Sequence, residues 1–144
     1  MKIFVTGVEG YIGALLAPML MRRGHEVVGL DAGYYRDGWL YSDNKSLTTF
    51  PRLVNKDLRH ITEEDLQGCD AVVHLAELSN DPLGQNNPEN TFKINHVGSV
   101  ELAKTARKAG IQKFVYTSSC SVYGAGSDEF LSESSQTNPL TAYA

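Results

Sequence analysis

Short apolar runs and helical patterns alternate along the chain from its first residues. Five runs rich in β-branched and aromatic residues have the length of strands, and they cover residues 2–6, 26–31, 53–57, 71–75 and 113–117. Strands that are apolar throughout and separated by helices predict a parallel sheet covered on both faces. The expected fold class is therefore α/β, a doubly wound parallel sheet of the Rossmann-like type with right-handed crossovers.

Two segments between these runs carry apolar residues at helical spacing, and each predicts a helix with one apolar face. The first ends at Gly24 and the second runs from Pro88 to Gly110. The predicted apolar faces consist of Ile12, Leu15, Leu16, Met19 and Leu20 in the first helix, and of Phe92, Val97, Val100, Ala103 and Ala106 in the second. Residues 32–51 and 124–137 have no clear period and are expected to be loops.

The composition narrows the class of protein. The 144 residues carry 13 Lys and Arg against 17 Asp and Glu, a formal net charge of −4. This length suits a single domain over residues 1–144. The acidic balance argues against sequence-independent binding to nucleic acid or to an anionic membrane, because both need a basic surface.

Targeting and metal signals are also weak. The uncharged apolar stretch 12–21 contains Gly13 and Pro18 and falls short of the ~20 residues that span a bilayer. Cys69 and Cys120 have no metal-ligand spacing, and His96, on a predicted helix, has no second ligand four residues later. We therefore expect a reduced, cytoplasmic protein without a metal site.

The first chemical signal is a glycine-rich turn between the first strand and the first helix. Its sequence, TGVEGYIG at residues 6–13, places Gly7, Gly10, Tyr11, Ile12 and Gly13 where a helix N-terminus can accept a pyrophosphate. Asp31 ends the next strand, where a carboxylate binds the adenosine ribose and repels a 2′-phosphate. NAD is therefore favoured over NADP, although the nearby Arg36 leaves NADP open.

Later segments resemble one known family. The TGxxGxxG spacing resembles the short-chain dehydrogenase/reductase superfamily rather than the GxGxxG of two-domain dehydrogenases. TSSCSVYG at residues 117–124 and NPLTAYA at 138–144 are similar to segments of its extended, nucleotide-sugar branch, and they follow in the same order. The whole chain resembles the NAD-dependent epimerase/dehydratase family. The resemblance also implies NAD contacts at Asp57 and Leu58 for the adenine, at Leu75 and Ala76 after His74 for the pyrophosphate and ribose, and at Asn95 on a helix.

The resemblance further implies two catalytic residues. Tyr143 would act as the base that removes a sugar hydroxyl proton during hydride transfer, and Ser119 would donate a hydrogen bond to the same oxygen, with Ser118 as its nearest rival. In the family a Lys four residues after the Tyr lowers the phenol pKa. Position 147 lies beyond Ala144, so we expect an N-terminal part that lacks the substrate lobe and has no turnover by itself.

The expected reaction is the epimerisation of a nucleotide-activated sugar by an intact protein that forms a homodimer. Cys120 and Ser121 stand where dehydratases of the family carry an acid–base pair, which disfavours dehydration. A reductase or dehydratase of the same family and a non-catalytic NAD(H)-binding domain remain alternatives. Glu77 replaces a usually small residue, either beside the nicotinamide or as a solvated loop carboxylate. Tyr34, Tyr35, Trp39 and Tyr41 either cover the adenine edge or pack the loop down.

Overall fold

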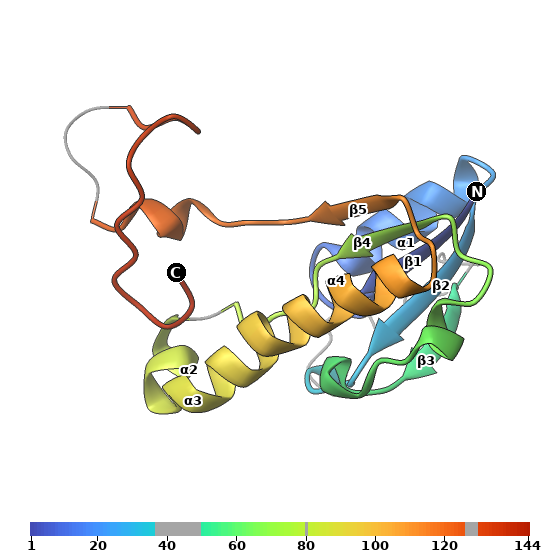
Figure 1. Ribbon diagram of the computed structural model, residues 1–144, viewed down its shortest axis with the longest axis horizontal. Coiled ribbons are helices and arrows are strands. Elements are labelled where there is room, and N and C mark those ends of the chain that lie inside the picture. The colour runs from blue at the N-terminus through green and yellow to red at the C-terminus, as the bar shows by residue number, and fades with distance from the viewer. Residues whose placement is uncertain (37–49, 80, 126–129) are drawn as a thin grey trace.

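The five predicted strands form one parallel sheet in the computed structural model, which describes residues 1–36, 50–79, 81–125 and 130–144 (Figure 1). The strand order is β3-β2-β1-β4-β5, and every neighbouring pair is parallel. The chain starts in the middle of the sheet and builds outward on one side and then on the other, so the predicted doubly wound fold is confirmed. The strands are β1 (Lys2–Thr6), β2 (Glu26–Asp31), β3 (Arg52–Asn55), β4 (Ala71–His74) and β5 (Lys113–Tyr116).

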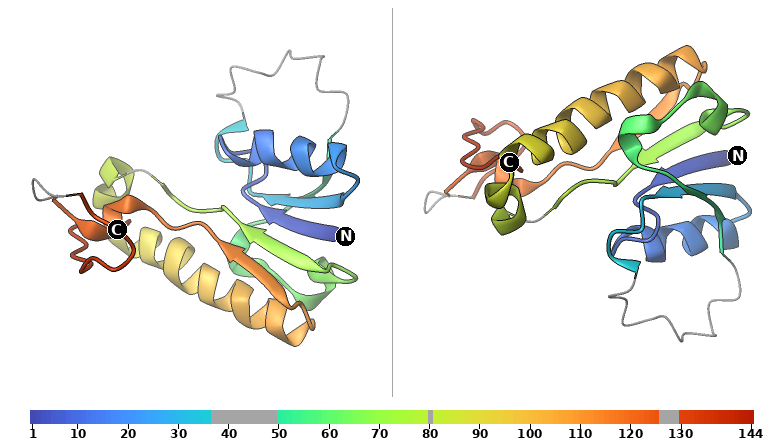
Figure 2. Two further views of the ribbon diagram at one scale, coloured as in Figure 1. Left: turned by 90° about the horizontal axis from the view of Figure 1, so that it is seen from above. Right: turned by 90° about the horizontal axis from the view of Figure 1, so that it is seen from below.

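Helices lie on both faces of this sheet. Figure 2 shows α1 (Gly13–Arg22) on one face and α4 (Ser99–Lys108) on the other. A π-helical stretch, Phe92–Gly98, joins α3 (Pro88–Thr91) to α4 in one continuous helix, as predicted for this segment. The sequence patterns did not predict α2 (Asp81–Asn86), in which Pro82 and Gly84 obscure the helical signal.

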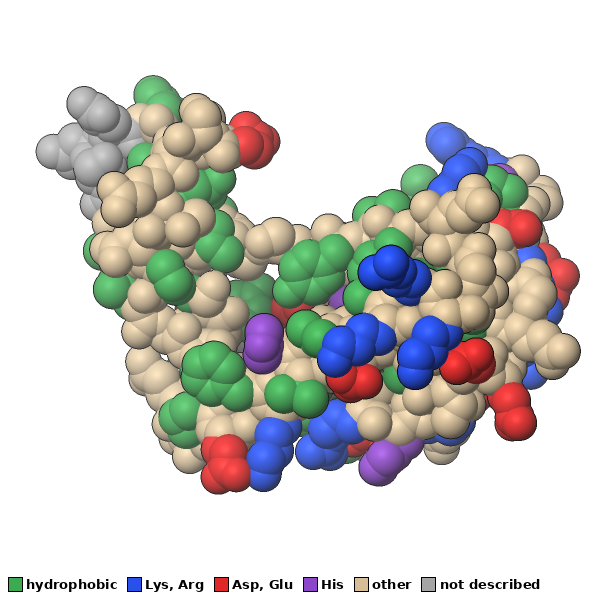
Figure 3. All heavy atoms as spheres, in the orientation of Figure 1, with side chains coloured by type: hydrophobic (Ala, Val, Ile, Leu, Met, Phe, Trp, Pro, Cys, Tyr) green, Lys and Arg blue, Asp and Glu red, His purple; other side chains and the backbone are tan. Residues whose placement is uncertain are grey.

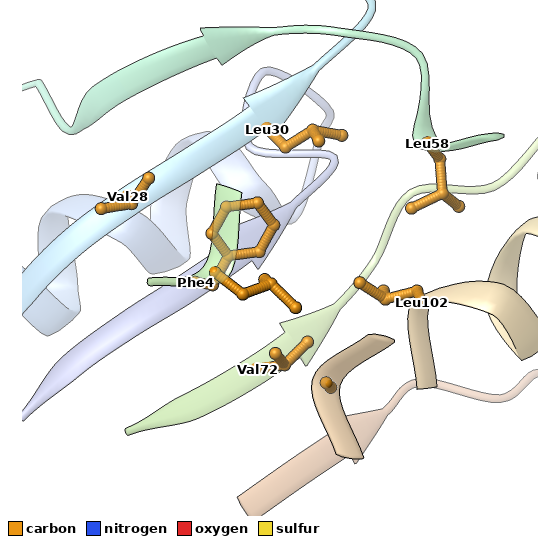
Figure 4. Close-up of a cluster of buried hydrophobic side chains, with 8 residues drawn as sticks. Phe4, Val28, Leu30, Leu58, Val72 and Leu102 are labelled. Atoms are coloured by element: carbon orange, nitrogen blue, oxygen red, sulfur yellow. The ribbon is translucent and has the colours of Figure 1, made fainter. Parts of the chain in front are cut away.

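Two apolar cores form because alternate strand residues point to opposite faces. Phe4, Val28 and Val72 face α4 and are fully buried beside Leu102 (Figure 4). On the opposite face, a second cluster packs against α1, and its buried members are Ile3, Val5, Val8, Ala17, Val27 and Ala71.

The predicted apolar faces of the two helices are wrong at most positions, although Leu20 packs against the core and Ala106 is buried, as predicted. In α1 the side chains of Leu15 and Met19 are exposed, and the helix packs on the sheet through Gly13, Ala17 and Pro18. In the second helix Phe92, Val97 and Val100 are exposed, whereas the buried positions are Thr91, Asn95, Gly98, Leu102 and Ala106. Small residues such as Gly13, Ala17 and Ala106 on the inner side let each helix approach the sheet closely, and Leu102 fills the core on the α4 side.

The prediction that both faces of the sheet are covered is also wrong for β5. All four of its residues are exposed, and Val115 shows 54% of its surface. In the described part of the chain β5 is an edge strand, beyond the reach of α1. Of the two predicted loops, residues 37–49 with Trp39 and Tyr41, and residues 126–129, lie outside the described residues.

Beyond β5 the described residues 117–125 and 130–144 form an arm, which extends past the carboxyl ends of the strands. Figure 1 shows this arm beside α2, and the Thr141 hydroxyl donates to Asp81 Oδ1 at 2.6 Å. The Asn138 N–H donates to the carbonyl of Val122, which closes the arm on a short 3-10 helix, Cys120–Tyr123. The surface is hollowed between the arm and the rest of the chain (Figure 3).

Candidate functional site

The glycine turn begins directly at the carboxyl end of β1. Gly7 has a φ of +69°, which a side chain disfavours, and its N–H donates to the Leu30 carbonyl of β2 at 2.8 Å. A Cβ on Gly7 would lie 2.9 Å from the backbone nitrogen of Ala76. The turn is therefore held tightly between β2 and the segment that follows β4.

The other two glycines of the turn differ in how much space they have. A Cβ on Gly13 would lie 2.1 Å from the Gly7 carbonyl oxygen, whereas one on Gly10 would lie 3.2 Å from it. Tyr11 and Ile12 are exposed, so their side chains do not fill the turn. At the start of α1 the N–H of Ala14 donates to the Gly10 carbonyl at 2.9 Å, and the N–H of Leu16 donates to the Ile12 carbonyl at 2.9 Å. The turn thus leads directly into a helix N-terminus, the position at which such folds bind an anion.

Asp31 is oriented by backbone groups at the carboxyl end of β2. Its carboxylate accepts the N–H groups of Glu9 at 2.9 Å and Gly33 at 2.8 Å. Arg36, the residue that left NADP open, forms an ion pair with Glu9 at 2.6 Å. The carboxylate of Asp31 and the turn are thus connected through Glu9.

Asp57 caps a short 3-10 helix, Leu58–His60, after β3. It accepts the Arg59 guanidinium at 2.7 Å and the Tyr34 hydroxyl at 2.9 Å. The Arg59 bond holds the pKa of Asp57 well below its usual range, and the bond to Asp57 raises the pKa of Tyr34. Beside this group lies a pocket of about 400 Å³, lined by Tyr34, Tyr35, Arg59, Leu78, Asn90 and Ile94.

Backbone groups after β4 are fixed by two polar side chains. The Thr6 hydroxyl oxygen accepts the N–H groups of Leu75 and Ala76, both at 3.1 Å. The side chain of Asn95 forms two hydrogen bonds with the backbone of Leu78. The Leu78 N–H donates to Asn95 Oδ1 at 2.8 Å, and Asn95 Nδ2 donates to the Leu78 carbonyl at 3.1 Å. Both polar atoms of the Asn95 amide thus hold the backbone two residues after Ala76, the second of the predicted cofactor contacts in this segment.

Burial lowers the pKa of His74 to about 4, and its side chain is only 1% exposed. Its neighbours are the hydroxyls of Thr6 and Ser99 and the ring of Tyr116, whose centroid lies 5.5 Å away and whose hydroxyl donates to Glu77. An unfolded histidine titrates near ~6.5, so between pH 4 and 6.5 the unfolded chain binds more protons than the folded one.

The free energy of unfolding should therefore fall by up to about 3 kcal/mol as the pH drops from 7 to 4. Urea denaturation at pH 7.5, 6 and 5 measures this slope. His74→Gln should show a smaller slope between pH 6.5 and 5, because its side chain does not titrate. An equal slope in both proteins would contradict the assignment to His74.

The structure does not join the two predicted catalytic residues. Ser119 caps the Cys120–Tyr123 helix, accepting the Ser121 N–H at 3.2 Å and donating to the Ser121 hydroxyl at 3.1 Å. Tyr143 lies in the arm, where its Cβ would be 3.9 Å from a Cβ on Gly84 of α2. In the described residues no hydrogen bond links Ser119 with Tyr143.

Glu77 is not a solvated loop carboxylate. It lies in the segment after β4, is partly buried, and accepts the hydroxyl of Tyr116 in β5 at 2.6 Å. Burial raises the pKa of Glu77, and burial together with this bond raises the pKa of Tyr116. A phenolate at Tyr143 would also raise the pKa of Tyr116, because two like charges repel each other.

Sequence reasoning missed Arg59, Ser99 and Gly29, and for Tyr34, which it named, it did not foresee the partner. Arg59 and Tyr34 bind Asp57, Ser99 binds His74, and Gly29 allows the turn to approach β2, since a Cβ there would meet Val8 Cγ1 at 2.5 Å. A glycine inside a strand signals such a close approach, and Arg59 lies only two residues after Asp57. The contacts of Tyr34 and Ser99 join distant segments and leave no local signal.

Across the described ranges, no three His, Cys, Asp or Glu residues are grouped so that they could hold a metal ion. None of the helices described is both long and apolar enough to cross a membrane.

Comparison with known proteins shows the family of the chain. A family model described as NAD dependent epimerase/dehydratase family matches residues 3–144. A UDP-glucose 4-epimerase of Mycolicibacterium smegmatis is 34% identical over 149 residues, which cover 100% of this chain and 47% of that protein. The chain therefore spans about half the length of the relatives it matches.

Two solved structures share the fold. A UDP-glucose-4-epimerase from Stenotrophomonas maltophila, with bound NAD and formylated UDP-arabinopyranose, has a TM-score of 0.84 and 31% identity, and covers 99% of this chain and 44% of that one. An NAD-dependent NDP-hexosamine 5,6-dehydratase involved in tunicamycin biosynthesis has a TM-score of 0.85 and 27% identity, and covers 99% of this chain and 45% of that one.

Proposed function

This chain belongs to the NAD-dependent epimerase/dehydratase family, and we propose that the protein binds NAD and epimerises a sugar carried on a nucleotide. The observation that carries the proposal is the meeting of the glycine turn, Asp31, Asp57 and residues 75–76 at the carboxyl edge of β1, β2, β3 and β4. Ligands of open α/β sheets bind at this edge. The relatives that hold NAD and UDP-sugars support the same reading.

The residues present fit an NAD molecule. The backbone around Gly7, Gly10, Tyr11, Ile12 and Gly13 would hold the pyrophosphate, because a side chain on Gly10 would point into space that is open apart from the Gly7 carbonyl. Asp31 would bind the adenosine ribose. Asp57 would bind the adenine together with the backbone of Leu58, whose side chain is buried in the core, and Leu75, Ala76 and Asn95 would line the nicotinamide half.

Residues of this chain would accept and return the proton of the sugar hydroxyl. When bound, NAD accepts a hydride from the sugar carbon and later returns it. Tyr143 would take the proton of the sugar hydroxyl as the hydride leaves and give it back afterwards. Ser119 would donate a hydrogen bond to the same oxygen, which requires its hydroxyl to turn away from Ser121.

The test separates the family's reactions by their products. The intact protein is incubated with NAD and UDP-glucose, and the sugar nucleotides are analysed by chromatography and mass spectrometry. An epimer of unchanged mass supports the proposal, and loss of one water indicates a dehydratase. Oxidation of added NADH in step with product indicates a reductase, and NAD binding without turnover indicates a non-catalytic NAD(H)-binding protein.

One observation favours dehydration as the second candidate. A dehydratase needs an acid and a base beside the hydride site, and Cys120 and Ser121 cannot supply them. Glu77, with its raised pKa and its bond to Tyr116, is a partly buried carboxyl that could replace them. The related hexosamine 5,6-dehydratase shows that the fold carries such chemistry.

Asp31 should determine the preference for NAD. A 2′-phosphate would face its carboxylate, and like charges in contact lower affinity. We expect NAD to bind at least about tenfold more tightly than NADP by calorimetry, and Asp31→Ala to narrow that gap. Asp70→Ala, which removes a carboxylate at the opposite edge of the sheet, should leave the ratio unchanged. Equal or tighter binding of NADP by the unaltered protein would shift the assignment to Arg36.

We also propose that the intact protein is a cytoplasmic homodimer. The exposed Phe92, Val97 and Val100 give the helix from α3 to α4 an apolar outer surface of the kind that subunit interfaces cover. Light scattering should give the mass of two chains, and Val97→Glu should shift it towards one. A monomeric mass at micromolar concentration would contradict the dimer.

A further inference from the structure

A chain of buried polar side chains runs beneath the proposed cofactor site and has no role in the chemistry above. It consists of Thr6, His74, Ser99 and the backbone carbonyl of Asn95. Thr6 and His74 are almost completely buried between the sheet and the helix that ends in α4. Buried polar groups of this kind are costly unless each one is satisfied.

The hydrogen bonds of Thr6 determine the tautomer of His74. The Thr6 oxygen already accepts the N–H groups of Leu75 and Ala76, so its own hydrogen points to His74 Nδ1 at 2.6 Å. His74 Nδ1 therefore accepts, and the imidazole carries its proton on Nε2. A charged imidazolium would leave the Thr6 hydrogen without an acceptor.

The hydrogen bonds run in the same donor-to-acceptor direction from His74 to Ser99 and Asn95 on the helix. His74 Nε2–H donates to the Ser99 hydroxyl oxygen at 2.7 Å, and the Ser99 hydroxyl donates to the Asn95 carbonyl. Both ring nitrogens of His74 and the hydroxyl of Ser99 then each have a hydrogen-bond partner. The tautomer is therefore fixed from both sides.

Both ends of this hydrogen-bonded row of side chains hold the segment that follows β4. Thr6 holds the N–H groups of Leu75 and Ala76, and Asn95 holds both backbone groups of Leu78. Asn95 belongs to the π-helical stretch Phe92–Gly98, and such distortions of a helix are frequent at functional sites. The Ala76 nitrogen also lies against Gly7 of the glycine turn.

We propose that His74 is a positioning residue: as the neutral Nε2–H tautomer, it couples Thr6 to Ser99 and thereby fixes residues 75–78 in the conformation that binds the nicotinamide half of the cofactor. This inference rests on the proposed NAD site. His74 touches neither the cofactor nor the substrate in this account and acts through the backbone that it holds.

The tautomer is tested directly by NMR. A long-range ¹H–¹⁵N correlation spectrum of the protein distinguishes the protonated from the unprotonated ring nitrogen, and His74→Gln identifies the signals of this residue. We expect Nδ1 to be unprotonated and Nε2 protonated at pH 7.5 and at pH 5.5. A proton on Nδ1 at pH 7.5 would overturn the proposal, whether or not NAD binds.

The coupling is tested with Thr6→Val, which removes the hydroxyl at nearly constant shape. This variant should bind NAD at least tenfold more weakly by calorimetry and should lose the fixed tautomer of His74. Thr6→Ser keeps the hydroxyl and should weaken binding less, and Thr105→Val, on α4 outside this network, is the matched control. NAD affinity in Thr6→Val equal to that of the control would overturn the coupling.

Two further measurements keep the outcomes distinct. If Thr6→Val does not fold, Ser99→Ala removes the other partner of His74 and should weaken NAD binding by a similar factor, and unchanged affinity there would overturn the coupling. If the unaltered protein binds no NAD, the proposed function fails, while the NMR spectrum still decides the tautomer.

Discussion

Gly13→Ala should destabilise the protein by more than about 3 kcal/mol and abolish NAD binding as a consequence. The added Cβ would lie 2.1 Å from the Gly7 carbonyl oxygen and 2.7 Å from Val8 Cα. Both are backbone atoms of the turn, so relief requires α1 to move away from β1. Urea denaturation followed by circular dichroism measures the loss.

Gly10→Val is the matched control, because it separates ligand binding from folding. A Cβ on Gly10 would lie 3.2 Å from the Gly7 carbonyl oxygen, a contact that a small shift relieves. This variant should keep its circular dichroism and a cooperative melt while losing NAD affinity, since the side chain would occupy the pyrophosphate position. A Gly13→Ala protein as stable as the unaltered one, or a Gly10→Val protein that binds NAD normally, would contradict the account of the turn.

The sequence predicted the sheet well because each strand carries its own local signal. β1 and β2 have the predicted bounds, while β3 spans residues 52–55 instead of 53–57. Asp57 leaves the strand because its carboxylate accepts the Arg59 N–H and starts a 3-10 helix. Such a cap depends on a bond between neighbouring residues that strand propensity does not describe.

The helix faces could not be predicted in the same way. Hydrophobic periodicity assumes that the larger apolar side chains face the sheet, but Leu15, Met19 and Phe92 point outward. Their helices pack largely through glycine and alanine together with Leu102, and the buried Asn95 finds its hydrogen-bond partners in Leu78, seventeen residues away. A pairing of this kind follows from the tertiary structure and has no signature in the local pattern.

Site residues in contiguous motifs could likewise be predicted from the sequence, whereas the arrangement of residues far apart in the chain could not. Gly7, Gly10, Gly13 and Asp31 lie in contiguous motifs, and the structure brings them together at the carboxyl edge of the sheet as expected. The roles of Ser119 and Tyr143 stay predictions, since the hydroxyl of Ser119 is engaged with Ser121 and Tyr143 lies in the arm. Their meeting would depend on a substrate that binds both.

Tyr143→Phe should lower kcat for the sugar nucleotide by about 10³-fold and leave the Kd for NAD unchanged. The variant removes only the phenol oxygen, so it removes the base without emptying the space it fills, and general base catalysis contributes about 10²- to 10⁴-fold. Turnover is measured on the protein that epimerises UDP-glucose in the assay above, and NAD binding by calorimetry.

Tyr123→Phe provides the matched control for this substitution. It removes the phenol oxygen of another partly buried tyrosine, in the Cys120–Tyr123 helix, and should change kcat by less than about threefold. Since loss of a base affects the transition state far more than binding, the ratio of the two kcat values isolates the role of the Tyr143 hydroxyl. Equal rates for the two variants would remove Tyr143 from the mechanism and leave Glu77, with its bond to Tyr116, as the remaining candidate base near that position.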